Sequence, residues 1–245
     1  MRVAELWRFP VKSLQGEQLD DATVADGGIV GDRAYALFDV DTGMGLTARR
    51  VPELLLASAR FVDEGTRPHI TLPDGTIAPG DAALSDWLGR PVALRAATDV
   101  GARRYENPLD AEREADWMLF DGAPGPFHDS ARTRVSLVST GTLGDWDRRR
   151  FRANVLLHGA GEDAYVGSTI TIGDVHLEVV KRIGRCVMIT RPQPGGIERD
   201  LDVFKEINRA RDGCLAIGAL VARAGTICVG DEVTPGGASA ARGRG

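Results

Sequence analysis

The segment KRIGRCVMITRP, residues 181–192, places a scarce thiol among arginines. The chain of 245 residues holds three cysteines, and Cys186 directly follows Arg185. Neighbouring cations lower the pKa of a thiol and favour the thiolate, the form that attacks electrophiles and ligates metals. The segment therefore predicts a reactive cysteine. The alternative is an inert thiol among apolar residues, as free cysteines usually are, and this is the role we expect for Cys214 and Cys228.

A second group of basic and amide residues stands where strands are expected to end. Lys12 and Ser13 follow a strand that a proline interrupts, and Arg33 follows GIVGD. Arg152 and Asn154 are two positions apart in RRFRANVLLH, so a strand here would project both from one face. Basic side chains bind phosphate, while an asparagine amide both donates and accepts hydrogen bonds. Together these residues suit a flat, dianionic ligand, whereas each arginine alone suits a solvated rim.

The order Gly184-Arg185-Cys186 sets a condition on the local backbone. In a regular strand, Arg185 and Cys186 would point to opposite faces. The two side chains can serve one site only if the chain is irregular there. Gly184 favours such an irregularity because glycine adopts conformations that other residues avoid.

Several common kinds of active site are not supported by the sequence. It contains no phosphate-binding loop of the GxxxxGK[ST] type, no GxGxxG and no GxSxG. The four histidines are scattered without an HExxH pattern, so we expect no histidine zinc site. A cysteine hydrolase would need a histidine beside Cys186. His176 lies in TIGDVHLEVV, where a half-buried strand position is the simpler role.

Composition and charge limit the classes of partner. The formal net charge of −5 argues against general nucleic-acid binding, which a basic surplus normally accompanies. No apolar run is long enough to span a bilayer, and the N-terminus lacks the apolar region of a signal peptide. Three cysteines do not make a disulfide framework. We therefore expect a cytoplasmic protein with neither a nucleic-acid nor a membrane partner.

The first hundred residues alternate strand patterns with turn signals. Strands are predicted over residues 3–9 and 33–40, and a hairpin over 69–80 turns at Asp74-Gly75. Residues 81–88 have apolar side chains at helical spacing and end at Gly89. These patterns predict a unit over residues 1–100. Gly, Pro, Asp and Arg then dominate residues 101–133, which we expect to be an irregular linker.

Strand patterns resume in a second unit, predicted over residues 134–234. A short helix is expected to begin near Ser139-Thr140, and a second one over 200–210, with Leu201, Phe204 and Ile207 on one face. The β-rich segments are 134–139, 152–158, 168–182, 185–190, 214–221 and 225–233. The tail 235–245 is low in complexity and expected to be disordered. Many short strands and few helices predict a mainly β (α+β) fold built from two β-barrel-like parts.

Several of these segments, in this order, resemble the MOSC proteins, a family named for the C-terminal domain of molybdenum-cofactor sulfurases. They are FPVKSL, GIVGDRAYAL with TARR, RRFRAN, GRCVMIT and GTICVGDEV. The resemblance runs from residue 1 to about 234 and is to the two-part form, an N-terminal β-barrel domain followed by the MOSC β-barrel with short flanking helices, as in the amidoxime reducing components. FRAN departs from the usual FRPN. VMITRPQPGG, with Arg191, replaces a common TT pair and Asp-Pro.

The resemblance implies a role for each matching position. Cys186 would be the thiolate ligand of molybdenum in a pterin cofactor, or the sulfur that carries a persulfide. The remaining implied cofactor contacts are Lys12, Ser13 and Arg33 from the N-terminal domain, and Arg152, Asn154, Gly184 and Arg185 from the MOSC domain. Thr133, in FHDSARTRVSL, is a further expected contact.

The resemblance also implies an activity, the reduction of N-hydroxylated or N-oxidised small molecules. The chain has no cysteine cluster for an iron–sulfur centre and no flavin fingerprint, so the electrons would come from a separate donor protein. The alternative is a non-redox protein that carries the cofactor or relays sulfur on Cys186. Both functions use the same cysteine, so the motif does not separate them.

Overall fold

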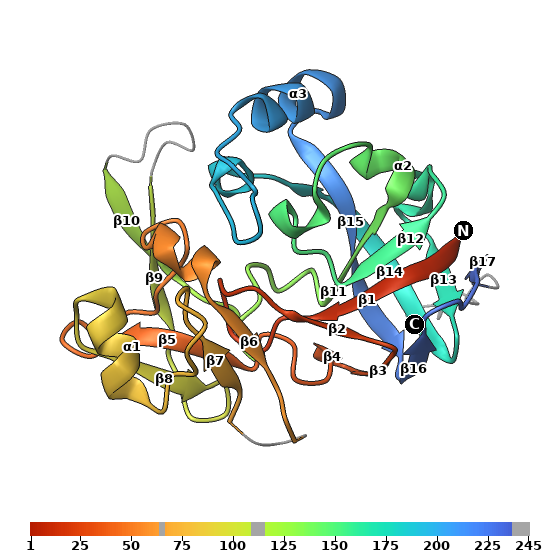
Figure 1. Cartoon of the computed structure of the whole chain (residues 1–245). Helices are drawn as coiled ribbons and strands as arrows, with labels where there is room; N and C mark the ends of the chain where they lie inside the picture. The colour runs from red at the N-terminus through yellow and green to blue at the C-terminus, as the bar shows by residue number, and fades with distance from the viewer. Residues whose placement is uncertain (64–66, 109–115, 237–245) are drawn as a thin grey trace.

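The computed structural model describes residues 1–63, 67–108 and 116–236, and the predicted disordered tail lies, from residue 237 on, outside them. The chain is mainly β with few helices, as predicted (Figure 1). None of the helices among the described residues is long and apolar enough to cross a membrane.

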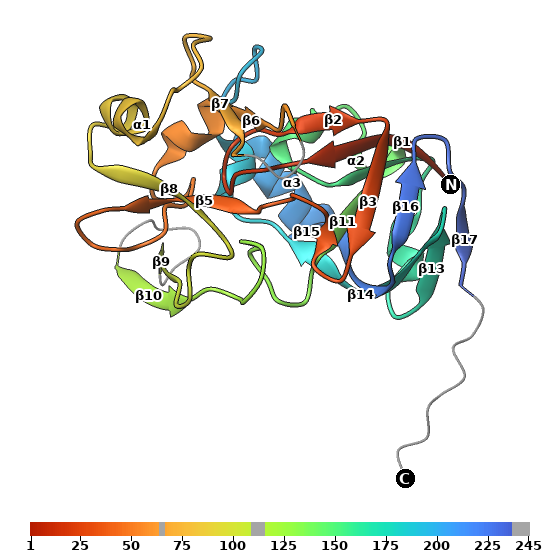
Figure 2. The same cartoon turned by 90° about the horizontal axis from the view of Figure 1, so that it is seen from below.

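An eight-stranded sheet forms the larger part of the molecule. Its order is β17-β13-β14-β15-β11-β12-β1-β2, antiparallel throughout except for the parallel pair β11 and β12. The strands are β1 (Arg2–Arg8), β2 (Glu17–Leu19), β11 (Val135–Ser139), β12 (Val155–His158), β13 (Thr169–Ile172), β14 (Val175–Gly184), β15 (Cys214–Arg223) and β17 (Val233–Pro235). A small sheet of β16 (Gly225–Cys228), β3 (Asp21–Ala25) and β4 (Gly28–Ile29) helps to enclose a core of aliphatic side chains (Figure 2). Alternation of buried and exposed residues in β3 is typical of such a one-sided sheet.

The opposite face of the large sheet is covered by short helices. They are α2 (Thr140–Leu143), α3 (Asp202–Arg211) and the 3-10 helices η2 (Arg148–Arg150), η3 (Glu162–Tyr165) and η4 (Val187–Thr190). Ser139 caps α2, as predicted, because its hydroxyl accepts a hydrogen bond from the Thr142 amide. In α3 the buried residues are Val203 and Ile207, whereas Leu201 precedes the helix and is exposed, so the predicted apolar face was wrong at that position.

A second core lies in the first half of the chain. It is formed by β5 (Tyr35–Asp39), β6 (Ser58–Arg60), β7 (His69–Thr71), β8 (Val92–Ala96), α1 (Asp81–Leu88) and the 3-10 helix η1 (Pro52–Leu56). The predicted helix 81–88 is confirmed, and Gly89 ends it in a left-handed conformation with φ 63°.

The start of the chain pairs with strands of the second half. β1 pairs with β12, and β3 pairs with β16, so the first 30 residues complete the sheets of the second half. Local patterns do not contain this information, because strand partners are chosen by long-range packing. The boundaries drawn from the sequence stay a prediction.

Two segments differ from the sequence prediction in type. The expected irregular linker contains a hairpin of β9 (Arg104–Pro108) and β10 (Trp117–Asp121), stabilised by stacking of Tyr105 on Phe120 at 5.5 Å between ring centroids. The segment 185–190, expected to be β-rich, follows the end of β14 at Gly184 and forms η4 from Val187 on. Met188 packs against the core of the first half and Ile189 lies in that of the second.

Candidate functional site

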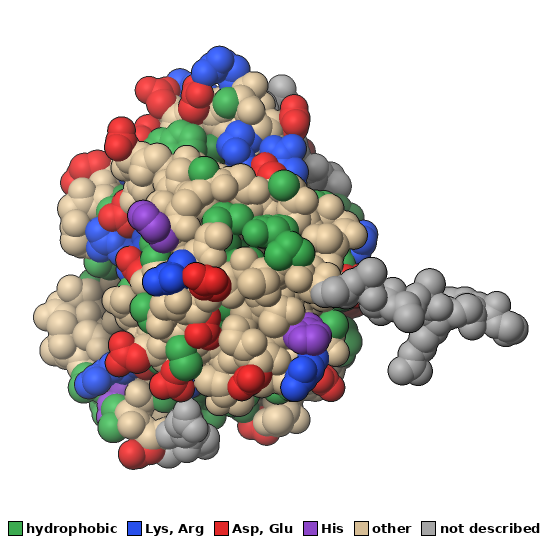
Figure 3. Space-filling view, turned by 90° about the vertical axis from the view of Figure 1, so that its right-hand side faces the viewer, with side chains coloured by type: hydrophobic (Ala, Val, Ile, Leu, Met, Phe, Trp, Pro, Cys, Tyr) green, Lys and Arg blue, Asp and Glu red, His purple; other side chains and the backbone are tan. Residues whose placement is uncertain are grey.

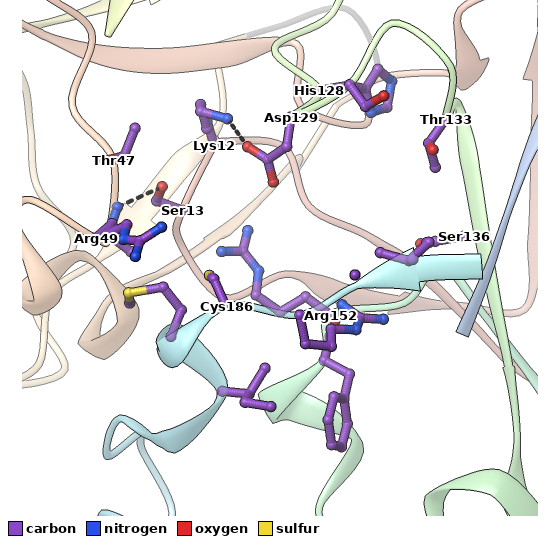
Figure 4. A pocket seen from close by; sticks show the side chains of 18 of the residues that line it. Lys12, Ser13, Thr47, Arg49, His128, Asp129, Thr133, Ser136, Arg152 and Cys186 are labelled. Atoms are coloured by element: carbon purple, nitrogen blue, oxygen red, sulfur yellow. Dashed lines mark hydrogen bonds and ion pairs between the residues drawn. The ribbon is translucent and has the colours of Figure 1, made fainter. Parts of the chain in front are cut away.

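A cavity of about 440 Å³ lies where the two halves of the chain meet, and Cys186 lines it (Figure 4). Its walls come from the first half, from the segment 128–136, from residues 150–154 before β12 and from the end of β14 with the residues that follow it. Every residue predicted as a cofactor contact lines this cavity: Lys12, Ser13, Arg33, Thr133, Arg152, Asn154, Gly184 and Arg185. The structure thus gathers residues that are up to 174 positions apart in the sequence from Lys12 to Cys186.

Cys186 is half-buried at the start of η4, immediately after β14 ends. The pairing of β14 with β15 is irregular here, since its register shifts between Arg182 and Gly184. The Arg185 amide still donates to Gly213 O, and Cys186, with an extended backbone, is the residue that precedes η4. The guanidinium of Arg185 donates to Leu215 O at 2.7 Å and to Phe151 O at 3.0 Å. It is thereby fixed in the wall, with Nη2 left without a partner.

Arg33 and Arg152 form a second positive wall. Their guanidinium groups lie 4.9 and 5.1 Å from the ring centroid of the buried Phe9, and Arg33 Nη2 donates to Arg152 O at 3.3 Å. Arg33 also pairs with the buried Asp32, whereas Nε of Arg152 is buried without a hydrogen-bond partner. Burial lowers the pKa of Arg152 to about 10, and the nearby charge of Arg33 contributes to that shift. Arg152 therefore remains charged at neutral pH.

Lys12 and Ser13 enter the cavity from the turn after β1. Lys12 is buried, pairs with Asp129 and donates to Phe127 O at 3.2 Å. Lys12 holds the pKa of the Asp129 carboxyl well below its usual range. Ser13 Oγ accepts a hydrogen bond from the Ala48 amide at 3.0 Å, so this hydroxyl is oriented by the loop that follows β5.

Asn154 has a different role from the one that its spacing suggests. It precedes β12 rather than lying in it, so it does not share a strand face with Arg152. Its Oδ1 accepts from Ser136 N and Oγ, and its Nδ2 donates to Trp7 O at 3.2 Å. The amide therefore joins β1, β11 and β12, and most of its hydrogen-bonding capacity is used within the protein.

Thr133 and Arg134 line the cavity in the segment before β11, and Figure 4 shows Thr133 well apart from Ser13 and Cys186. Thr133 Oγ1 and Arg134 Nη1 are buried without hydrogen-bond partners. Thr133 can lie against β15 only because position 218 is glycine: a Cβ there would stand 2.7 Å from Thr133 Oγ1. The close approach of Thr133 to β15 is therefore built into the packing.

Positive charge dominates the cavity in a chain whose formal net charge is −5. Eight cationic side chains of the described residues line it: Lys12, Arg33, Arg49, Arg134, Arg150, Arg152, Lys181 and Arg185. Asp129 is the one lining carboxylate among the described residues. By contrast, acidic and basic side chains are interspersed on the face shown in Figure 3. A polar pocket with low-dielectric walls concentrates its field, so this cavity attracts anions.

The structure adds residues that the sequence analysis did not single out. Arg49 lies in TARR and Asp129 in FHDS, two segments noted only for their resemblance to known proteins. Lys181 and Arg150 also line the cavity. Arg150 donates a hydrogen bond to Ile189 O at 3.1 Å and so helps to fix the position of η4. His176, the possible base of a hydrolase, lies on β14 away from the cavity lining. Cys214 is half-buried, whereas Cys228 is exposed rather than packed in a core.

These residues fit an anionic pterin cofactor with a phosphate group. The unpaired donors of Arg134, Arg152 and Arg185 are buried polar groups that only a ligand or water can satisfy. Charge-assisted bonds from guanidinium groups are those that bind phosphate most strongly. Cys186 carries the one thiol that lines the same space among the described residues, and a thiolate is a soft metal ligand.

Comparison with known proteins gives two family matches. The MOSC N-terminal beta barrel domain matches residues 1–94, and the MOSC domain matches residues 126–234. The chain is 25% identical over 254 residues to the molybdenum cofactor sulfurase of Drosophila grimshawi, covering 91% of this chain and 32% of that protein. Identity to the molybdenum cofactor sulfurase of Danio rerio is 23% over 266 residues, with 90% and 32% covered. The chain thus spans about a third of the length of these relatives.

Two solved structures show limited similarity. The YuaD protein from Bacillus subtilis gives a TM-score of 0.44 at 13% identity, over 95% of this chain and 93% of that chain. YiiM from Geobacillus stearothermophilus gives 0.35 at 13% identity, over 56% and 72%. Both scores are too low to add to the assignment, which rests on the family matches. Since these two matches follow each other in order and cover most of its length, the chain belongs to the MOSC family, with the family's N-terminal β-barrel domain preceding the MOSC domain.

Proposed function

We propose that this protein binds a molybdenum cofactor and reduces N-hydroxylated or N-oxidised small molecules, with Cys186 as the metal ligand. The proposal is supported by the relation between the Cys186 thiol and the cavity wall. The thiol opens into a cavity whose walls contain buried guanidinium groups with unsatisfied N–H donors. An anion with a soft metal satisfies both features at once.

Different residues of the cavity would bind different parts of the cofactor. Arg134, Arg152 and Arg185 would bind the anionic part of the cofactor, and the fixed guanidinium of Arg185 would hold positive charge beside the Cys186 thiolate. When bound, the cofactor supplies two-electron oxygen-atom transfer. In the overall reaction of an N-oxide, the N–O bond breaks, two electrons and two protons are taken up, and the oxygen leaves as water. A separate one-electron carrier protein would deliver the electrons.

The test is the molybdenum and pterin content per chain of protein made in a host that synthesises the cofactor. Cys186→Ser should lose the metal while unfolding at nearly the same temperature, because the two side chains are close in size. Cys214→Ser and Cys228→Ser are the matched controls and should retain both metal and pterin. A Cys186→Ser protein with stoichiometric molybdenum would refute the ligand assignment.

The second candidate function is a cofactor carrier or sulfur relay in which Cys186 holds a persulfide. It is favoured by the fact that both curated relatives are named molybdenum cofactor sulfurase. Turnover distinguishes the two: loaded protein with reduced methyl viologen as the electron source should consume an N-oxide. Bound cofactor without turnover, or a persulfide on Cys186 detected by mass spectrometry, would favour the carrier.

A further inference from the structure

Asp129 occupies the centre of positive charge in the cavity. Its carboxylate pairs with Lys12, and its pKa is lowered first by Lys12 and further by Arg33 and Arg152. It also acts on the charge of the buried Arg185. One carboxylate is thus within electrostatic reach of four cations from separate parts of the chain.

The two members of the Lys12–Asp129 pair differ in how firmly they are held. The Lys12 side chain is 8% exposed and is also held by Phe127 O and by the ring of Tyr105, whereas the Asp129 side chain is 91% exposed. Lys12 is therefore part of the wall, and Asp129 reaches into the open space of the cavity. Because the Asp129 side chain is largely exposed, it can leave Lys12 without exposing a core.

The position of Asp129 is also the position at which a bound oxyanion would gain most. A carboxylate and a phosphate present the same kind of acceptor oxygens to lysine and arginine. Two anions cannot share Lys12 closely, because like charges at short range repel strongly in a cavity of low dielectric.

We infer that Asp129 is an internal competitor for the oxyanion group that this cavity binds, and that the Lys12–Asp129 pair must open before the ligand is seated. The apparent affinity of the site is therefore its intrinsic affinity multiplied by the fraction of molecules in which the pair is open. Asp129 also neutralises Lys12 while the cavity lacks a ligand. The inference rests on the proposed function only for the identity of the natural ligand, since competition can be measured with a simple phosphate.

The experiment measures phenyl phosphate binding by calorimetry to the full chain, produced in a host that does not make the pterin. Asp129→Asn keeps the shape of the side chain and removes its charge, so it should bind phenyl phosphate about tenfold more tightly or better. Asp145→Asn, an exposed carboxylate outside the cavity lining, is the control for overall charge and should bind like the natural sequence. Asp129→Ser provides the same comparison if the asparagine variant folds poorly.

A double variant separates competition for Lys12 from general repulsion. In a Lys12→Met background, Asp129→Asn should change the affinity much less than it does in the natural sequence, because the contested partner is gone. Equal or weaker binding by Asp129→Asn would overturn the inference and make Asp129 a contributor to ligand binding. An increase in affinity on Asp129→Asn that is equally large in the Lys12→Met background would also overturn the inference. Neither result depends on molybdenum or turnover, so the proposed function is tested separately by the Cys186 variants.

Discussion

Ser13, Arg33 and Arg152 all line the cavity and all have left-handed backbones, with φ of 73°, 51° and 51°. Side chains other than glycine disfavour this conformation by about 1–2 kcal/mol per residue. Such strain persists where the surrounding fold imposes it, and it clusters at functional sites. In Arg33 and Arg152, this backbone conformation accompanies guanidinium groups that lie over the ring of Phe9.

Arg152 allows backbone strain and ligand binding to be tested separately. Arg152→Gly removes the guanidinium and relieves the strain, whereas Arg152→Ala removes only the guanidinium. Without cofactor, we expect the glycine variant to be about 1 kcal/mol more stable than the alanine variant, as measured by urea unfolding. Both should bind the pterin at least about tenfold more weakly, because a charge-assisted hydrogen bond is lost.

The two measurements are independent of each other. Retention of normal pterin content in both variants would show that Arg152 does not hold the cofactor. Equal stability of the two variants would instead show that the left-handed backbone costs little.

At the scale of elements, the end of β14 determines the shape of the site. Gly184 is the last residue of the strand and lines the cavity, and a Cβ built there would meet nothing within 4 Å. Its backbone is outside the left-handed region. The fold therefore tolerates a side chain at this position, and glycine leaves the space open for a ligand.

Gly184→Leu should leave the thermal midpoint unchanged within about 2 °C, because the added side chain enters open space. It should sharply lower the pterin content per chain, because leucine fills part of the cavity. Gly218→Ala is the contrasting variant: its Cβ would lie 2.7 Å from Thr133 Oγ1, so it should lower the midpoint. Full pterin content in Gly184→Leu would show that the cofactor lies away from the end of β14.

Much of the site could be predicted from residue types at the ends of expected strands, but its geometry could not. Strand patterns located the turn after β1 and hence Lys12. Cys186 was singled out by the scarcity of cysteine and by its arginine neighbours, in a segment that was expected to be β-rich. They could not show that Asn154 would be used internally, because that depends on β1 lying beside β12. The hairpin β9–β10 was missed because Gly, Pro, Asp and Arg dominate the surrounding segment 101–133, and aromatic stacking across the pair contributes to its stability.

At the scale of the whole molecule, the segment 126–134 links the two halves across the cavity. The Phe127 amide donates to Arg33 O, and His128 Nε2 donates to Gly27 O at 3.0 Å in the turn between β3 and β4. Burial lowers the pKa of His128 to about 4, and the charge of Arg33 contributes. At neutral pH the ring is therefore neutral, and its hydrogen bond holds the segment 126–134 to the turn between β3 and β4.

This shift predicts how the stability of the whole protein depends on pH. In the unfolded chain, histidine takes up a proton near pH 6.5, whereas His128 in the folded chain does so only near pH 4. As the pH falls from 6.5 to 4, the unfolded state binds more protons than the folded state, so His128 should cost about 3 kcal/mol of stability by pH 4. His128→Gln keeps an Nε2–H donor and does not titrate, so its unfolding free energy should fall less over this range.

The comparison requires urea unfolding at pH 7 and pH 4 for the natural sequence and two variants. His158→Gln, an exposed position at the end of β12, is the matched control and should follow the natural sequence. If His128→Gln loses as much stability between the two pH values as the control, the histidine is not held neutral. The link between the halves would then rest on the backbone bonds of Phe127 and on the Lys12 contacts alone. A smaller loss of stability in His128→Gln would identify the segment 126–134, which links the two halves of the chain, as the part of the cavity wall that acid destabilises first.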